Sequence, residues 1–264
     1  MKENDRCLAN LSASPVTTEE REWVQRTIKR GRGKTADDIQ NVSPHLQPYD
    51  ENGEKVQIMI PRRAEQNPDA TAVTQVQAIL AVEREDHEER FDIVDHFWVG
   101  DSHGLGQSVM AFDLINMSKT DVKLNPLPKF IIPNALSDEA DEAKSVWQSL
   151  PCDSDVKSAR LMVIKFDELT EEEQTAFWGG VLETDVFRVV TLVSSGDKTI
   201  HALVEVEGEY GAFRERVLRL CCSAEDVRYR CDPTTLHPSA LTCLAGARRF
   251  DTGRYQELLF ARCS

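Results

Sequence analysis

Two aspartates, a lysine and a histidine in the second half of the chain have side chains suited to phosphate chemistry. Asp167 ends an apolar stretch, and Lys198 and His201 follow within the sequence SSGDKTIH. Asp232 lies further along, before the arginine-rich stretch LAGARRFDTGR. Carboxylates bind Mg²⁺ or Mn²⁺, while lysine and histidine hold phosphate oxygens. These are the parts that nucleotidyl transfer requires, and no other segment gathers as many.

The composition indicates a soluble, acidic protein. The chain has 264 residues, of which 41% are hydrophobic, so it can bury one large core or two small ones. Its formal charge of −14 argues against broad electrostatic binding of nucleic acid or anionic membranes. Residues 214–262 are locally basic, with nine arginines against six acidic residues. Because neither a signal peptide nor a membrane span is evident, we expect a cytoplasmic protein without a membrane partner.

The cysteines leave two interpretations open. Seven are present, and none forms a CxxC pair. A zinc site built from Cys222, Cys231 and Cys243 is one interpretation, although the spacing fits no common zinc motif. Reduced thiols of a cytosolic protein are the interpretation we favour.

The elements that must position the chemical groups follow from the hydrophobic pattern. In the first half we expect helices at 17–30, 70–82 and 138–150, and strands at 56–60, 97–100 and 130–133. In the second half we expect strands at 161–166, 188–193, 201–206 and 257–261, with helices at 170–182 and 210–220. This β-α-β-β-α-β order predicts an α+β fold with an RRM-like or ferredoxin-like split βαβ core.

Strand geometry brings the candidate groups to one surface. Side chains alternate along a strand, so Lys165 and Asp167 share a face. In a split βαβ sheet the strands that carry Asp167 and His201 are neighbours. Asp232 follows the second helix and can return to the same surface. The competing interpretation is structural, in which Asp167 only ends a strand and SGDKT is only a hairpin turn.

The ordered set of segments resembles a known family. An apolar strand ending in E-x-D, a helix carrying E-E-Q, an S-G-x-K-S-x-H turn and a downstream aspartate occur in the archaeo-eukaryotic primases, most similarly in the primase domains of bacterial mobile elements and phages. The matching segments here are LMVIKFDEL, LTEEEQTAFWGGVLE, VVTLVSSGDKTIHALVEVEG, YGAFRERVLRL and RCDPTTLHPSALTCLAGARR. The resemblance is strong over 160–261 and weaker back to 91. Together with the polar composition of 1–16 and the helical pattern that follows, it divides the chain into a disordered tail (1–16), a mostly helical N-terminal α/β extension (17–90) and a primase-like domain (91–264).

The resemblance implies a role for each matching position. It makes Asp167 and Asp232 ligands of Mg²⁺ or Mn²⁺ and makes His201 a ligand of the nucleotide phosphates. The expected nucleotide-binding residues are Ser195, Lys198, Thr199 and His201. Arg248 and Arg249 are expected to contact the template. The implied partners are nucleoside triphosphates, single-stranded DNA and a separate replicative helicase.

Two positions depart from the family pattern. Lys165 stands where the family has the first carboxylate of E-x-D, which removes a metal ligand and adds a positive charge beside the cation. The family's R-L-P-G turn appears here as CLAG at 243–246. Lys165 therefore marks an inactive domain, or one metal with altered ligands suffices, or Lys165 forms an ion pair with Asp167 and replaces the metal.

Three functions follow from these alternatives. The first is a metal-dependent primase-polymerase that acts on single-stranded DNA in the replication of a mobile element or phage. The second is a catalytically inactive primase-derived module that binds nucleotide or nucleic acid. The third is a protein-interaction module, which the acidic composition favours.

Overall fold

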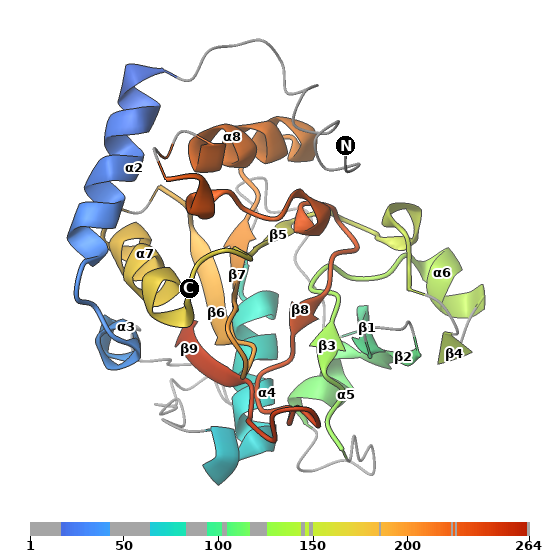
Figure 1. The fold of residues 1–264 in the computed structure, drawn as a ribbon. Helices are drawn as coiled ribbons and strands as arrows, with labels where there is room; N and C mark the ends of the chain where they lie inside the picture. The colour runs from blue at the N-terminus through green and yellow to red at the C-terminus, as the bar shows by residue number, and fades with distance from the viewer. Residues whose placement is uncertain are drawn as a thin grey trace.

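The computed structural model describes residues 17–42, 64–82, 94–101, 105–116, 126–143, 146–147, 150–184, 186–222, 224 and 226–262. The predicted tail at 1–16 and the predicted strand at 56–60 lie outside these ranges. Within them the protein has an α+β fold with two antiparallel sheets (Figure 1). None of the helices in these ranges has the length and apolar character that crossing a bilayer requires.

The first half of the chain contributes helices and most of one sheet. Its helices are α2 (Thr18–Gly31), α3 (Ala36–Val42), α4 (Pro68–Leu80), α5 (Ala111–Ile115) and α6 (Asp138–Ala143). Its strands are β1 (His96–Gly100), β2 (Gly106–Met110), β3 (Phe130–Ile131) and β4 (Val146–Trp147). With β8 (Thr242–Cys243) these strands form a sheet in the order β4-β2-β1-β3-β8.

The second half forms the other sheet. Its strands are β5 (Leu161–Ile164), β6 (Val189–Ser194), β7 (Ile200–Glu205) and β9 (Glu257–Ala261), and its helices are α7 (Glu171–Thr184) and α8 (Tyr210–Cys222). The order is β5-β7-β6-β9, with every neighbouring pair antiparallel. Strands β5 and β6 are therefore parallel with β7 between them, as a split βαβ unit requires.

The final strand departs from the ferredoxin-like arrangement. In that arrangement the last strand lies beside the first, whereas here β9 pairs with β6 at the opposite edge. The other edge strand, β5, continues instead into an isolated bridge between Phe166 and Cys231. The sequence predicted β9 at its observed residues, but nothing in those residues indicated which edge this strand would join.

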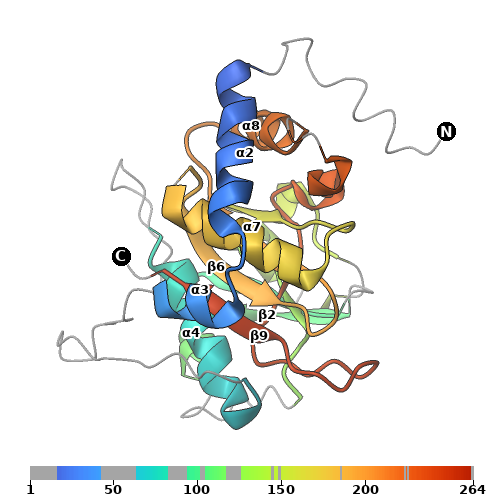
Figure 2. The ribbon, with the colours of Figure 1, turned by 60° about the vertical axis from the view of Figure 1, so that its left-hand side comes forward.

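Hydrophobic alternation places a core on each face of the second sheet. On one face, Val163, Val193 and Leu203 pack with α4 and with the strands of the first sheet. On the other face, Ile164 and Ala202 pack against α7 and α8. Figures 1 and 2 show α2, α7 and α8 together on this second side. Lys165, which follows β5, and His201, in β7, lie two positions from Val163 and Leu203, so the core fixes the face on which they lie.

Helix α2 is packed onto the rest of the molecule. A capping box opens the predicted helix: the Thr17 hydroxyl accepts from the Glu20 amide at 3.1 Å, and the Glu20 carboxylate accepts from the Thr17 amide at 2.8 Å. The helix then crosses α7 at small residues (Figure 2). Within the predicted extension, α2 is therefore a packed element of the fold.

One predicted helix is wrong in its second half. We expected a helix over 138–150, but α6 ends at Ala143 and the chain enters β4 at Val146–Trp147. Val146 pairs with Gln107 and Trp147 with Gly106. These pairings complete an edge of the first sheet, and tertiary hydrogen bonding there outweighs the local helical pattern.

Candidate functional site

Strand pairing places Lys165 beside His201. The register of β5 and β7 ends with Ile164 opposite Ala202, so the next positions along the two strands are Lys165 and His201. Lys165 follows the alternation of Val163, and His201 follows that of Leu203, so both lie on the face toward the first sheet. The sequence predicted one surface for Asp167 and His201, and the strand register places Lys165 next to His201.

Backbone hydrogen bonding also brings Asp232 to the end of β5. The Asp232 amide donates to the Lys165 carbonyl at 2.9 Å, next to the bridge between Phe166 and Cys231. The Asp232 side chain caps the short turn that follows, where Oδ1 accepts from the amide and the hydroxyl of Thr234 at 2.9 Å and 2.6 Å. Asp232 is therefore held against Lys165 by the backbone on one side and by Thr234 on the other.

The Lys165 ammonium lies between the two aspartates that were expected to bind metal. Its Nζ is 3.1 Å from Asp232 Oδ2 and 3.4 Å from Asp167 Oδ1. The Asp232 side chain is largely buried, whereas the Asp167 side chain is 56% exposed. The ion pair with Asp167 that the sequence left as an alternative is present, together with a second ion pair to Asp232.

These contacts favour the charged forms of Lys165 and Asp232. Burial would lower the pKa of Lys165, but the hydrogen bond to Asp232 and the charge of Asp167 outweigh it, so the pKa is raised. Burial would likewise raise the pKa of Asp232, but the hydrogen bonds from Thr234 and Lys165 outweigh it, so the pKa is lowered. At neutral pH the cluster is a protonated amine between two carboxylates.

This arrangement does not fit a divalent cation. Both oxygens of Asp232 already accept hydrogen bonds or an ion pair, and a cation between the aspartates would meet the Lys165 ammonium at contact distance. Repulsion between a single and a double positive charge there amounts to several kcal/mol even with a screened dielectric. The described residues also contain no group of three histidine, cysteine or acidic side chains placed to hold a metal ion.

His201 is buried and neutral. Its residue is 8% exposed, and its Nδ1 atom is buried without a hydrogen-bond partner in the described structure. Burial and the nearby positive charges of Lys165 and Arg249 lower its pKa to about 4, against an opposing effect of Asp232. His201 can therefore offer a neutral imidazole, but not a positive charge, to a phosphate at neutral pH.

The low pKa of His201 predicts a pH-dependent loss of stability. The unfolded chain binds a proton at this residue near the ordinary histidine pKa of 6.5, whereas the folded chain does so only near pH 4. Protons therefore favour unfolding as pH falls through this window, by roughly 2–3 kcal/mol at pH 4.5. Urea unfolding of wild type and His201→Gln between pH 7.5 and 4.5 measures this effect. The free energy of unfolding of His201→Gln should fall less than that of wild type as pH decreases. Equal pH dependence of the two proteins would contradict the low pKa of His201.

The SSGDKT segment forms a tight hairpin turn between β6 and β7. The Ser195 amide donates to the Thr199 carbonyl at 2.8 Å, and the Thr199 hydroxyl donates to the Ser195 hydroxyl at 2.9 Å. Gly196 has φ of +72°, the left-handed conformation that glycine tolerates best. Lys198 is exposed at the tip. Two of the predicted nucleotide-binding side chains, Ser195 and Thr199, thus bind each other within the turn.

Gln174 holds this turn against α7, a role that the sequence did not reveal. Its side-chain amide donates to the carbonyls of Leu169 and Lys198 at 2.8 Å and 3.0 Å. Its side-chain oxygen accepts from the Ile200 amide at 2.8 Å. The E-E-Q segment of the sequence therefore serves to position the turn.

Arg248 and Arg249 lie on a hairpin between β8 and β9. Arg249 pairs with Asp251 through two nitrogen atoms, with Nε at 2.9 Å from Oδ1. The Arg248 Nε donates to the Gly253 carbonyl at 3.1 Å. The Thr252 hydroxyl donates to the Gly196 carbonyl at 3.1 Å, which joins the hairpin to the SSGDKT turn. The predicted template residues and the predicted nucleotide turn are therefore neighbours.

The described cysteines are free thiols, in agreement with the interpretation that we favoured. Cys231 and Cys243 are buried in the cores on opposite faces of the second sheet, so they do not share a zinc site. The side chain of Cys222 lies outside the described residues. Burial raises the pKa of the Cys243 thiol to about 12, although Arg249 and Lys165 oppose the shift. Cys243 is thus a neutral neighbour of the candidate site.

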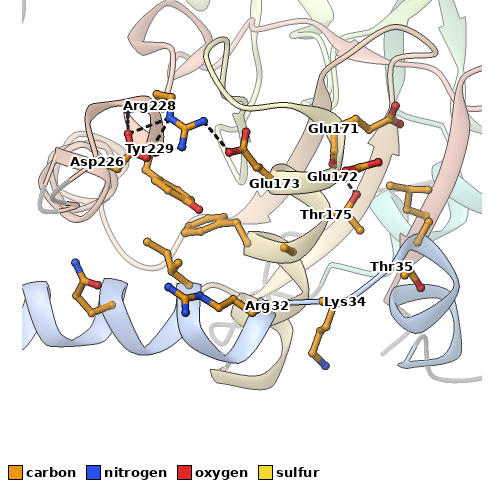
Figure 3. Close-up of a pocket in the computed structure, with 17 residues that line it drawn as sticks. Arg32, Lys34, Thr35, Glu171, Glu172, Glu173, Thr175, Asp226, Arg228 and Tyr229 are labelled. Atoms are coloured by element: carbon orange, nitrogen blue, oxygen red, sulfur yellow. Dashed lines mark hydrogen bonds and ion pairs between the residues drawn. The ribbon is translucent and has the colours of Figure 1, made fainter.

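A cavity of about 900 Å³, whose lining residues are drawn in Figure 3, lies on the α7 side of the second sheet, opposite the face of Lys165. It is bounded by the end of α2, the start of α7 and the segment that carries Tyr229. At its rim Arg228 pairs with Asp226 and Glu173 at 2.7 Å each. The cavity therefore contains none of the residues that the sequence marked as catalytic or nucleotide-binding.

Comparisons with protein-family models, with curated proteins and with solved structures gave no match for this chain. The likeness to the archaeo-eukaryotic primases thus stands on the motifs quoted above.

Proposed function

We propose that the chain is a primase-type domain that binds single-stranded nucleic acid and does not catalyse metal-dependent nucleotidyl transfer. The observation that carries this proposal is the position of the Lys165 ammonium, 3.1 Å and 3.4 Å from the two candidate metal ligands Asp232 and Asp167. The resemblance to primases provides the class of ligand. Because the Lys165 ammonium stands between the candidate metal ligands, we expect binding without catalysis.

The arrangement of cations around the site supports nucleic acid as the ligand. The hairpin that carries Arg248 and Arg249 is bonded to the SSGDKT turn through Thr252. Arg249 is also close enough to His201 to lower its pKa. A local basic surface in a chain with a net charge of −14 is where a polyanion would bind.

One observation favours the metal-dependent alternative. The Asp167 side chain is more than half exposed and has a single 3.4 Å ion pair to hold it. It can rotate toward a cation more readily than the buried Asp232 can. Metal-dependent primer synthesis therefore remains the second candidate, and it predicts that Asp167 is essential.

The two candidates differ in a direct assay. Purified wild type and Asp167→Ala are incubated with single-stranded DNA, primer, nucleoside triphosphates and Mg²⁺ or Mn²⁺, and binding to the same DNA is followed by fluorescence anisotropy. We expect binding by both proteins and extended product from neither. Product from wild type that disappears in Asp167→Ala would establish the metal-dependent enzyme. Absence of DNA binding by the wild type would refute the proposed function.

A further inference from the structure

An aromatic side chain stands at the tip of the arginine hairpin. Phe250 is 76% exposed, more than any other large hydrophobic residue in the described ranges. Figure 2 shows the hairpin projecting from the body of the protein ahead of β9, near the red end of the colour bar. An exposed phenylalanine gains no packing energy in the isolated chain, so its ring is available for contact with a ligand.

One face of this ring is occupied by a cation. The Lys129 ammonium lies 4.9 Å from the centroid of the Phe250 ring. A lysine over an aromatic face is held by the ring quadrupole and orients the ring in return. The high exposure of Phe250 leaves the remainder of the ring open to solvent, and Lys129 places a positive charge beside it.

Two of the three hairpin arginines, and Lys129 beside the ring, form no ion pair within the described residues, whereas Arg249 is paired with Asp251. Among the described residues, Arg248, Arg254 and Lys129 form no ion pair, whereas Arg188, Arg216, Arg219 and Arg228 each do. Arg248 instead lies 5.9 Å from the centroid of the Tyr255 ring. The hairpin therefore carries two arginines without an ion pair in addition to the exposed aromatic ring.

The hairpin is also preorganised. Arg248 and Tyr255 form an antiparallel bridge, and the Arg249 amide donates to the Arg254 carbonyl at 2.9 Å. Gly253 has φ of +69°, and its amide donates to the Arg249 carbonyl at 3.0 Å, which closes the turn. A ring carried on such a turn loses little conformational entropy when a ligand stacks on it.

We propose that Phe250 stacks on a base of single-stranded nucleic acid while Lys129 contacts the adjacent phosphate. This inference rests on the proposed function and adds the residues that would hold the strand. An aromatic ring with flanking cations is the general means of binding single strands without reading their sequence, because every base has a stacking face.

The charge distribution indicates which side of the hairpin a nucleic-acid strand would follow. Arg248 and Arg254 line a cavity of about 620 Å³ together with Glu65, Glu171 and Glu257, so that side of the hairpin is acidic. Phe250 and Lys129 are not among the residues that line this cavity. The strand is therefore expected to run along the Lys129 side of the hairpin, away from this cavity.

The test uses the full chain and a fluorescein-labelled 20-nucleotide single-stranded DNA of mixed sequence. Phe250→Ala should weaken binding by about 10- to 100-fold, the range of base–aromatic stacking. Phe250→Trp should retain the affinity, and its tryptophan fluorescence should be quenched by the DNA beyond the change seen in wild type. Lys129→Gln should weaken binding less and should lower the salt dependence by about one charge. Val227→Ala, at another exposed apolar position, is the matched control and should bind like wild type.

The outcomes separate this inference from the proposed function. If wild type binds the DNA and Phe250→Ala binds equally well, stacking at Phe250 is refuted while nucleic-acid binding stands. If wild type does not bind the DNA, both proposals fail, and a protein partner becomes the explanation for the exposed ring. Because Phe250 is on the surface, loss of binding in the alanine variant is not attributable to unfolding, and its circular dichroism should match that of wild type.

Discussion

Replacing Lys165 by glutamate is expected to create a site that binds Mn²⁺ or Mg²⁺. The substitution removes the ammonium that now lies 3.1 Å and 3.4 Å from Asp232 and Asp167, and it places a third carboxylate between them. Three acidic side chains on one face are a ligand set that these hard cations prefer. The wild type, with a resident positive charge, should bind neither cation at this site.

The same substitution should destabilise the protein when no metal is present. Asp232 is largely buried and would lose its ion pair while gaining a negative neighbour, a change that costs several kcal/mol when a paired charge is buried. Because Lys165 is about one quarter exposed, we expect a smaller cost of about 2–3 kcal/mol, or a fall in Tm of roughly 5–10 °C. Mn²⁺ at about 100 times its Kd should restore about 2.7 kcal/mol.

Thermal unfolding with and without Mn²⁺ measures both effects. Lys165→Gln is the matched control, since it removes the positive charge without adding a ligand. It should be destabilised and should gain little from Mn²⁺. A wild type that Mn²⁺ stabilises as much as it stabilises Lys165→Glu would show that the lysine leaves the metal site open. Primer extension by Lys165→Glu alone would show further that one charge reversal separates this domain from an active polymerase.

The sequence predicted the strand positions and the face on which Lys165 lies, because both follow from local alternation of buried and polar residues. It also predicted the helix at 17–30, which begins with a local capping box between Thr17 and Glu20. The contact between Lys165 and Asp232 was not predictable in this way. Asp232 lies 67 positions after Lys165 in the chain. An isolated backbone bridge between Phe166 and Cys231 brings it back beside β5.

Other features were hidden for the same reason. The sequence predicted Ser195 and Thr199 as ligands of phosphate. It does not reveal that their hydroxyl groups bond each other and close the turn. A last strand could pair with either β5 or β6 in the second sheet, and no residue in β9 indicates which one it joins. Close contacts between helices are not evident from the sequence either. A glycine in a helical pattern indicates weak helix propensity, and it does not show that another helix packs against it.

Gly180→Ala is expected to cause a large loss of stability through the contact between α2 and α7. A Cβ atom at Gly180 would lie 2.2 Å from the Thr27 carbonyl oxygen, and one at Gly31 would lie 1.7 Å from the Ala176 carbonyl oxygen. Backbone atoms cannot move aside as a flexible side chain can, so α2 must shift from its position across α7 (Figure 2). We expect a cost of about 3 kcal/mol, or a fall in Tm of roughly 6–12 °C.

The adjacent glycine provides the matched control for this prediction. A Cβ atom at Gly179 would meet only the side chain of Lys34, at 2.7 Å, and that side chain can rearrange. Because alanine also favours the helix, Gly179→Ala should stay within about 1 kcal/mol of wild type. Urea unfolding compares the two variants, and limited proteolysis reports whether α2 has become accessible. Equal stability of the two variants would mean that α2 does not depend on this close crossing, whereas early cleavage in α2 of Gly180→Ala alone would locate the loss at the contact with α7.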